Sequence, residues 1–172
     1  MQPAKCTSDT DHLYLTETGG LFLMASKMMQ AESTGNKHIN IDKLMSLFGR
    51  YYQVRDDYND VVTAQDKGTA AKYYDLDQGT FTLPIIHALT IQRENGNTEL
   101  FGILQTRNET RTMSADNKSL FMMRLRELGS LEYTKSVLDK LHKELMDELR
   151  VVEEKMGIKN WILRLMLHHL RV

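Results

Sequence analysis

Residues 49–62 read GRYYQVRDDYNDVV, and this stretch carries most of the information about the fold and chemistry of the chain. Apolar residues recur before and within it at intervals of three and four, the spacing of one buried helix face. This apolar series consists of Leu44, Leu47, Phe48, Tyr51, Val54, Tyr58 and Val61. The pattern predicts an amphipathic helix from about Ile41 to Val62.

Three carboxylates interrupt this apolar series. Asp56, Asp57 and Asp60 form a DDxxD pattern, and Gln53 lies one turn earlier, so helical spacing places all four side chains on one face. Clustered carboxylates repel one another unless water screens them or a cation neutralises them. Oxygen ligands on a helix suit Mg²⁺, which keeps several waters and bridges to phosphate oxygens. The alternative is a solvated acidic face, but the surrounding tyrosines and valines favour a cavity wall.

The rest of the chain also has helical patterns. Gly19-Gly20 should mark a break or a close contact, Thr63 to Gly79 is predicted to be a polar loop, and Asn95 to Asn97 a turn. Further helices are expected at about Ser8 or Thr10 to Gln30, Phe81 to Ile91, Glu99 to Gln105, Ser114 to Leu128, Ser130 to Met156 and Asn160 to Leu170. With no strand pattern, the predicted fold class is all-α, and the length fits a single domain, residues 1–172.

Composition excludes several classes of protein. The net charge is −1, so no basic footprint for nucleic acid is expected. The single cysteine, Cys6, rules out a disulfide framework and a thiolate metal cluster. No apolar run approaches the ~18 residues of a membrane span, and residues 1–10 lack the apolar core of a signal peptide. A cytoplasmic location is therefore the expectation.

The aspartate segment resembles the second aspartate-rich motif of trans-prenyl diphosphate synthases. Further matches to the fungal-type geranylgeranyl diphosphate synthases follow in the order expected of that family and cover nearly all of the chain past about residue 12. They are TGGLF at 18–22, MQAEST at 29–34, DLDQG at 75–79, FTLPIIHAL at 81–89, GILQ at 102–105, GSLEYT at 129–134 and the tail from Ile162.

The resemblance implies the second half of an isoprenoid-synthase-type helical bundle. Members of this family condense isopentenyl diphosphate with an allylic diphosphate, and Mg²⁺ held by two aspartate-rich motifs draws off the allylic diphosphate. By resemblance, Asp56, Asp57 and Asp60 would hold Mg²⁺, with Gln53 supporting the site. The implied ligand is an isoprenoid chain or a prenyl diphosphate.

The sequence departs from the family pattern in three ways. The family's first aspartate-rich motif is absent from these residues. Glu17 stands where the family has a lysine before TGGLF, and reversing that charge costs several kcal/mol on the order-of-magnitude scale. Thr80 replaces another family lysine, and Lys67 or Lys72 is a possible substitute for a lysine in the preceding loop. Apolar faces left without neighbours predict a homo-oligomer or a complex with a prenyl synthase subunit.

Three functions follow from these observations. The first is prenyl transfer with a partner that supplies the missing motif. The second is a repurposed cyclase acting on a terpenoid or another polyene, which the loss of the two lysines favours slightly. The rival, from another class, is a non-catalytic regulatory subunit that docks on a full-length prenyl diphosphate synthase.

Overall fold

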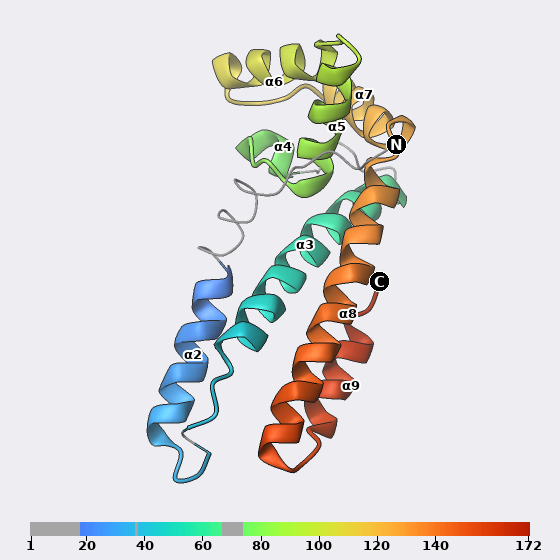
Figure 1. Ribbon diagram of the computed structural model, residues 1–172. Coiled ribbons are helices and arrows are strands. Elements are labelled where there is room, and N and C mark those ends of the chain that lie inside the picture. The colour runs from blue at the N-terminus through green and yellow to red at the C-terminus, as the bar shows by residue number, and fades with distance from the viewer. Residues whose placement is uncertain (1–17, 37, 67–73) are drawn as a thin grey trace. The chain divides into compact units, whose positions relative to one another are not determined.

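The computed structural model describes residues 18–36, 38–66 and 74–172, and their regular secondary structure is entirely α-helical (Figure 1). The helices are α2 (Thr18–Glu32), α3 (Asp42–Asp66), α4 (Tyr74–Gln78), α5 (Leu83–Glu94), α6 (Glu99–Thr110), α7 (Ala115–Glu127), α8 (Ser130–Met156) and α9 (Trp161–His169). The all-α prediction is confirmed. The part of the first predicted helix before Thr18 lies outside the described residues.

Local signals in the sequence set most helix ends. Ser114 accepts a hydrogen bond from the Asn117 backbone N–H at 3.2 Å, and Asn160 accepts one from the Leu163 N–H at 3.0 Å, so both are N-caps. Pro84 lies in the first turn of α5, where no backbone donor is needed. Gly129 adopts a left-handed backbone with φ of 66°, which ends α7 without strain on a side chain.

The loop predicted from Thr63 to Gly79 is wrong at both ends. Helix α3 continues to Asp66, and residues 74–78 form the short helix α4. The cause is Leu76, whose side chain is completely buried in a cluster with Ile85 and Leu100. A single buried leucine among polar residues has no periodicity, so the pattern of the sequence does not reveal it. Helix α6 also extends to Thr110, beyond the predicted end at Gln105.

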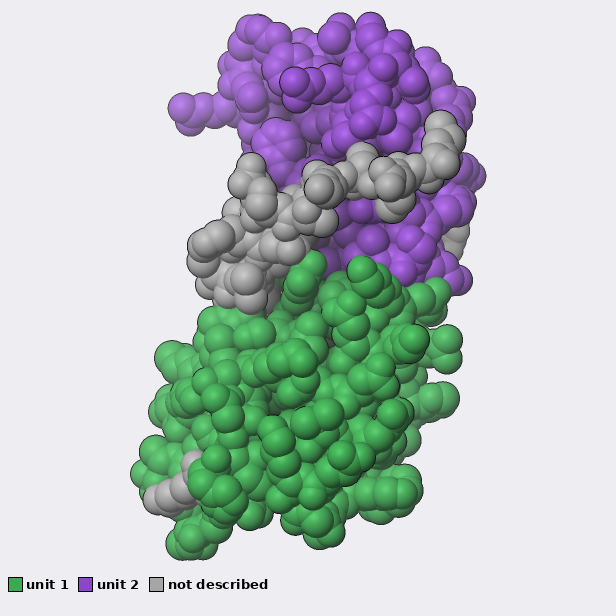
Figure 2. Space-filling view, in the orientation of Figure 1, with its two compact units in different colours: residues 1–53, 138–172 green, residues 54–137 purple. Residues whose placement is uncertain are grey.

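The described chain forms two compact units (Figure 2). Unit 1 comprises residues 1–53 and 138–172, and unit 2 comprises residues 54–137. The long helices α3 and α8 each contribute residues to both units. The single domain expected for residues 1–172 stays a prediction, because two compact units can belong to one domain.

Unit 1 is held together by the apolar stripe of α8 and by a close contact between α2 and α3. The stripe is buried at Leu138, Leu141, Leu145, Leu149 and Val152. Phe22 of α2 packs edge-on against Phe48 of α3, with 4.8 Å between ring centroids. A Cβ built on Gly49 would lie 2.6 Å from the Gly19 Cα, so glycine is needed where these helices meet. Of the two alternatives predicted at Gly19-Gly20, a break or a close contact, the structure has the close contact, at Gly19, and α2 is unbroken.

Unit 2 has its own core around α5, α6 and α7. The fully buried members of this cluster are Val61, Leu76, Ala88, Leu100, Phe121 and Leu125, and Tyr58 of α3 packs against it. At about 25 cal/mol per Å² of buried apolar area, such a cluster supplies most of the driving force for a small helical unit. The C-terminal half of α3, from Val54 to Asp66, carries the aspartates and is part of this unit.

Candidate functional site

Helix α3 presents the aspartate-rich segment from a rigid support. Its inner side is fixed by Tyr51, Val54 and Val61, which are at most 2% exposed. The Tyr51 hydroxyl donates a hydrogen bond to the Leu170 carbonyl at 2.8 Å, so the ring is held by packing and by polar contact. Residues placed on such a helix keep their spacing, which a metal site requires.

The aspartates differ in exposure across the helix face. At 100° per residue, Asp56, Asp60 and Asp57 lie in that order across an arc of about 100°. The Asp56 side chain is 44% exposed and Asp60 is exposed, whereas Asp57 is only 6% exposed. Gln53, the last residue of unit 1, is half-buried one turn before Asp57. Asp56 and Asp60 are therefore the two aspartates that solvent or a ligand can reach, and they are called the outer pair.

Asp56 has an unfavourable electrostatic environment. Burial raises the pKa of its carboxyl above the ordinary value, Arg55 opposes this change, and the negative charge of Asp60 raises the pKa further. The Arg55 guanidinium reaches the Asp56 carboxylate at 3.3 Å, which relieves part of the penalty. A cation placed between Asp56 and Asp60 would relieve more, because two neighbouring carboxylates resist ionising together.

These residues fit Mg²⁺ as a two-carboxylate site rather than as a closed protein cage. In the described part of the chain, no group of three or more His, Cys, Asp or Glu residues is arranged to hold a metal ion. Mg²⁺ does not need such a group, because it is commonly bound by one or two carboxylates, several waters and substrate phosphate oxygens. Asp56 and Asp60, one helical turn apart, would supply the carboxylate share of that set.

A second polar cluster surrounds Asp77 of the DLDQG segment. The buried Lys118 ammonium contacts the Asp77 carboxylate at 2.5 Å, and the Met113 backbone N–H donates to the same carboxylate at 3.2 Å. The hydrogen bond from Lys118 lowers the pKa of Asp77. Arg107 donates to the Asp77 backbone carbonyl at 2.8 Å and packs against Gly79. This cluster fixes the segment that leads to Thr80, and sequence reasoning missed it.

The positions that depart from the family pattern are only partly visible. Thr80 is exposed at the end of the Asp77 segment, where its hydroxyl cannot replace a cation. Glu17, Lys67 and Lys72 lie outside the described residues. The assignment of a substitute lysine therefore stays a prediction.

His87 has a structural role in α5. Its ring stacks on Tyr133 with 4.1 Å between centroids, and its Nδ1 lies 3.0 Å from the Ser130 hydroxyl. Burial lowers the pKa of the imidazole, against a smaller opposing effect of Glu94. His87 is therefore a half-buried histidine whose ring contacts serve the packing of α5 against α8.

Comparison with known proteins decides the family. A family model described as polyprenyl synthetase matches residues 8–120, which is more than half of the chain. The chain belongs to the polyprenyl synthetase family. This result confirms the resemblance read from the aspartate segment and the TGGLF and FTLPIIHAL matches, and places the chain in a family of isoprenoid biosynthesis. Members of the family generally use Mg²⁺ and bind isoprenoid diphosphates.

Similar proteins include several fungal terpene synthases. Dolasta-1(15),8-diene synthase from Colletotrichum gloeosporioides is 45% identical over 91% of this chain and 22% of its own length. Bifunctional sesterterpene synthase astC from Talaromyces wortmannii is 42% identical over 91% of this chain and 21% of its own length. Preasperterpenoid A synthase PvPS from Talaromyces verruculosus is 35% identical over 98% of this chain and 22% of its own length. The chain thus spans about a fifth of the length of these curated relatives.

Within the described ranges, no helix combines the length and the apolarity that crossing a bilayer requires.

Proposed function

We propose that this chain contributes the second aspartate-rich motif to an isoprenoid-processing site. In this proposal Asp56 and Asp60 hold Mg²⁺, and the ion would neutralise the diphosphate of a prenyl substrate. Asp57 holds the inner edge of the site, and Gln53 supports the aspartates from the preceding turn. The supporting observation is the placement of two outward-facing carboxylates one helical turn apart, where burial raises the pKa of Asp56, Arg55 opposes this change and Asp60 raises the pKa further.

The proposed activity has a prenyl-transfer form and a cyclase form. The relatives are named as synthases of dolasta-1(15),8-diene, of sesterterpenes and of preasperterpenoid A, so terpenoid formation is the product class we favour. The chain's own residues would bind and orient the diphosphate end of the substrate. The cytoplasmic location remains a prediction.

A melting experiment tests the aspartate site. A ligand that binds only the folded state raises the free energy of unfolding, and with it the melting temperature, by mass action. At a ligand concentration of about 100 times the dissociation constant, the gain in free energy is about 2.7 kcal/mol. Farnesyl diphosphate with Mg²⁺ should stabilise the wild type, and Asp56→Asn or Asp60→Asn should abolish the effect. Glu144→Gln, an exposed acid of α8, serves as the matched control and should behave as the wild type. Equal stabilisation of the wild type and both aspartate variants would show that the site lies elsewhere.

Helix α2 supports the proposal that this chain works in contact with other helices. Leu21, Met24, Met28 and Met29 recur along one side of α2 and are between 57% and 74% exposed. An apolar stripe of this size marks an interaction surface. We infer that it packs against a second copy or a synthase subunit, and the alternative of a regulatory subunit rests on the same surface. Light scattering of wild type and Met24→Lys/Met28→Lys tests this: a mass that does not change with the double substitution excludes self-association through α2.

A further inference from the structure

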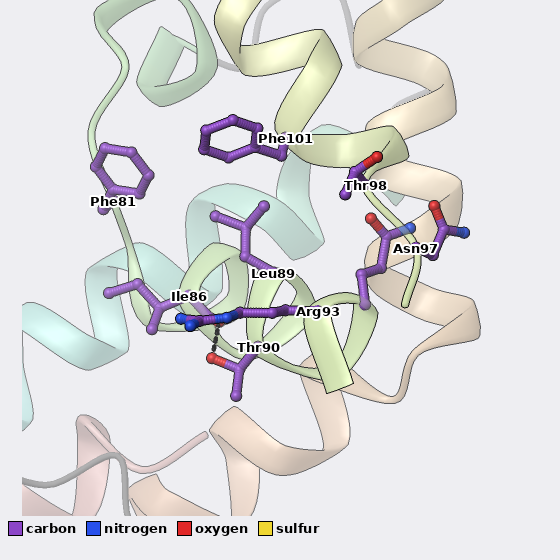
Figure 3. A pocket seen from close by; sticks show the side chains of 9 residues that line it. Phe81, Ile86, Leu89, Thr90, Arg93, Asn97, Thr98 and Phe101 are labelled. Atoms are coloured by element: carbon purple, nitrogen blue, oxygen red, sulfur yellow. Dashed lines mark hydrogen bonds between the residues drawn. The ribbon is translucent and has the colours of Figure 1, made fainter. Parts of the chain in front are cut away.

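Unit 2 contains a hollow that plays no part in the proposed aspartate site. It lies between α5 and α6 and has a volume of about 550 Å³, within the usual range of small-ligand pockets (Figure 3). All of its lining residues fall between positions 81 and 101. It therefore shares no residue with the aspartate face of α3.

The walls of the hollow are mainly hydrocarbon. Phe81 and Phe101 lie opposite one another, with Ile86 and Leu89 beneath them (Figure 3). Leu89 packs on the core of unit 2, so the floor is rigid, whereas Phe81 and Phe101 are 50% and 63% exposed. A single exposed aromatic is ordinary, but two rings facing across one apolar hollow offer a slot for a flat or flexible hydrocarbon.

One cation accompanies this apolar lining. Among the described residues, none forms an ion pair or a hydrogen bond with the Arg93 guanidinium, which lies along the hollow beside Thr90. Glu99, the first residue of α6, is bound to Arg124 at 2.7 Å. Thr90 donates its hydroxyl proton to the Ile86 carbonyl at 2.8 Å. The hollow thus combines hydrocarbon walls with one uncommitted positive charge.

We infer that this hollow binds an amphiphilic anion, a single flexible hydrocarbon chain with one negatively charged head. The chain lies between Phe81 and Phe101 over the aliphatic floor, and the head accepts hydrogen bonds from Arg93. A guanidinium recognises carboxylates and phosphates equally well, so both prenyl monophosphates and fatty carboxylates have the required chemistry. The inference does not depend on the proposed aspartate site, because it involves different residues and no metal ion.

Calorimetric titration in buffer containing a metal chelator tests this inference. Farnesyl monophosphate and dodecanoate are the two probes, and farnesol is the uncharged control. Arg93→Gln should weaken binding of the better probe about tenfold, the loss expected for a charge-assisted hydrogen bond. Phe101→Ser should weaken it by a similar factor, about tenfold, because hydrocarbon burial is lost. Lys135→Gln removes an exposed cation outside the hollow and should leave binding unchanged.

Each alternative result has a definite meaning. If one probe binds with the expected dependence on Arg93 and Phe101, its class identifies the ligand, and farnesol should then bind at least tenfold more weakly. Equal binding to wild type and Arg93→Gln overturns the inference. So does binding that Asp56→Asn removes, because the probe then occupies the aspartate face. The inference would also be overturned if the wild type formed a dimer that Phe101→Ser dissociates, because the hollow would then be a contact surface between two copies of the chain. Phe101 is largely exposed, so its loss should leave the helical circular dichroism spectrum unchanged.

Discussion

Substituting Gly49 by alanine should destabilise unit 1 by forcing α2 and α3 apart. The new Cβ would lie 2.6 Å from the Gly19 Cα and 2.9 Å from its backbone N, whereas ordinary contacts begin at 3.4 Å. The obstructing atoms belong to the backbone and cannot rotate away, so α2 must move by about 0.8 Å. The Phe22–Phe48 ring contact spans the same two helices and should be disturbed with it.

The net magnitude follows from two opposing effects. Overpacking a well-packed contact costs up to about 3 kcal/mol. Replacing glycine by alanine within a helix returns about 1 kcal/mol. We therefore expect a net loss of about 2 kcal/mol, which lowers the melting temperature of a chain of this size by about 4–8 °C.

Gly102 provides the matched control. It lies within α6, and a Cβ added there would meet nothing within 4 Å. Gly102→Ala should therefore raise the free energy of unfolding by about 0.5–1 kcal/mol. Urea denaturation followed by far-ultraviolet circular dichroism measures both variants. If Gly49→Ala proved as stable as Gly102→Ala, α2 and α3 would not pack as closely as described, and the explanation for glycine at position 49 would fail.

Three further predictions test other contacts. Asp77→Asn should cost about 2 kcal/mol at neutral pH. The hydrogen bond from Lys118 lowers the pKa of Asp77 below its ordinary value of 3.8. The ionised Asp77 therefore contributes its full stabilisation above pH 3.8 and loses it as the pH falls through the pKa of the folded state. Measuring the free energy of unfolding at decreasing pH checks this. His142→Leu should stabilise the chain by about 1 kcal/mol in thermal melting, because its buried Nε2 has no hydrogen-bond partner within the described residues. Glu153→Gln should speed hydrogen exchange in α9 about tenfold and leave the centre of α8 unchanged, since Glu153 binds Arg164 and the Asn160 N–H of that helix.

The sequence predicted those features that depend on local chemistry. Ser114 and Asn160 are caps because a short polar side chain precedes an apolar series, and that signal is visible without a structure. The buried stripe of α8 follows in the same way from its regular leucine spacing. Helix α4 could not be predicted, because it depends on the burial of Leu76 against residues distant in the sequence.

The sequence predicted which residue types form the candidate site, but it did not predict how far each side chain is buried. Spacing placed Asp56, Asp57 and Asp60 on one helix face, yet it could not show that Asp57 is buried while Asp60 is exposed. That difference arises from tertiary packing around α3, which a local pattern does not encode. The Asp77 cluster was missed for the same reason, since its partner Lys118 lies on another helix.

The cations of the described Asp77 cluster bear on how a diphosphate could be neutralised. Arg107 donates to the Asp77 backbone carbonyl, and the Lys118 ammonium pairs with the Asp77 carboxylate. Thr80 itself brings no charge, although the family has a lysine there. In this segment of the described chain, these two positive charges are therefore engaged in contacts that stabilise the fold. Under the proposed function, charge neutralisation therefore depends mainly on Mg²⁺ held by Asp56 and Asp60, unless Lys67 or Lys72 supplies the substitute cation. Diphosphate binding should consequently disappear when a chelator removes Mg²⁺, whereas a site based on lysines would retain part of its affinity.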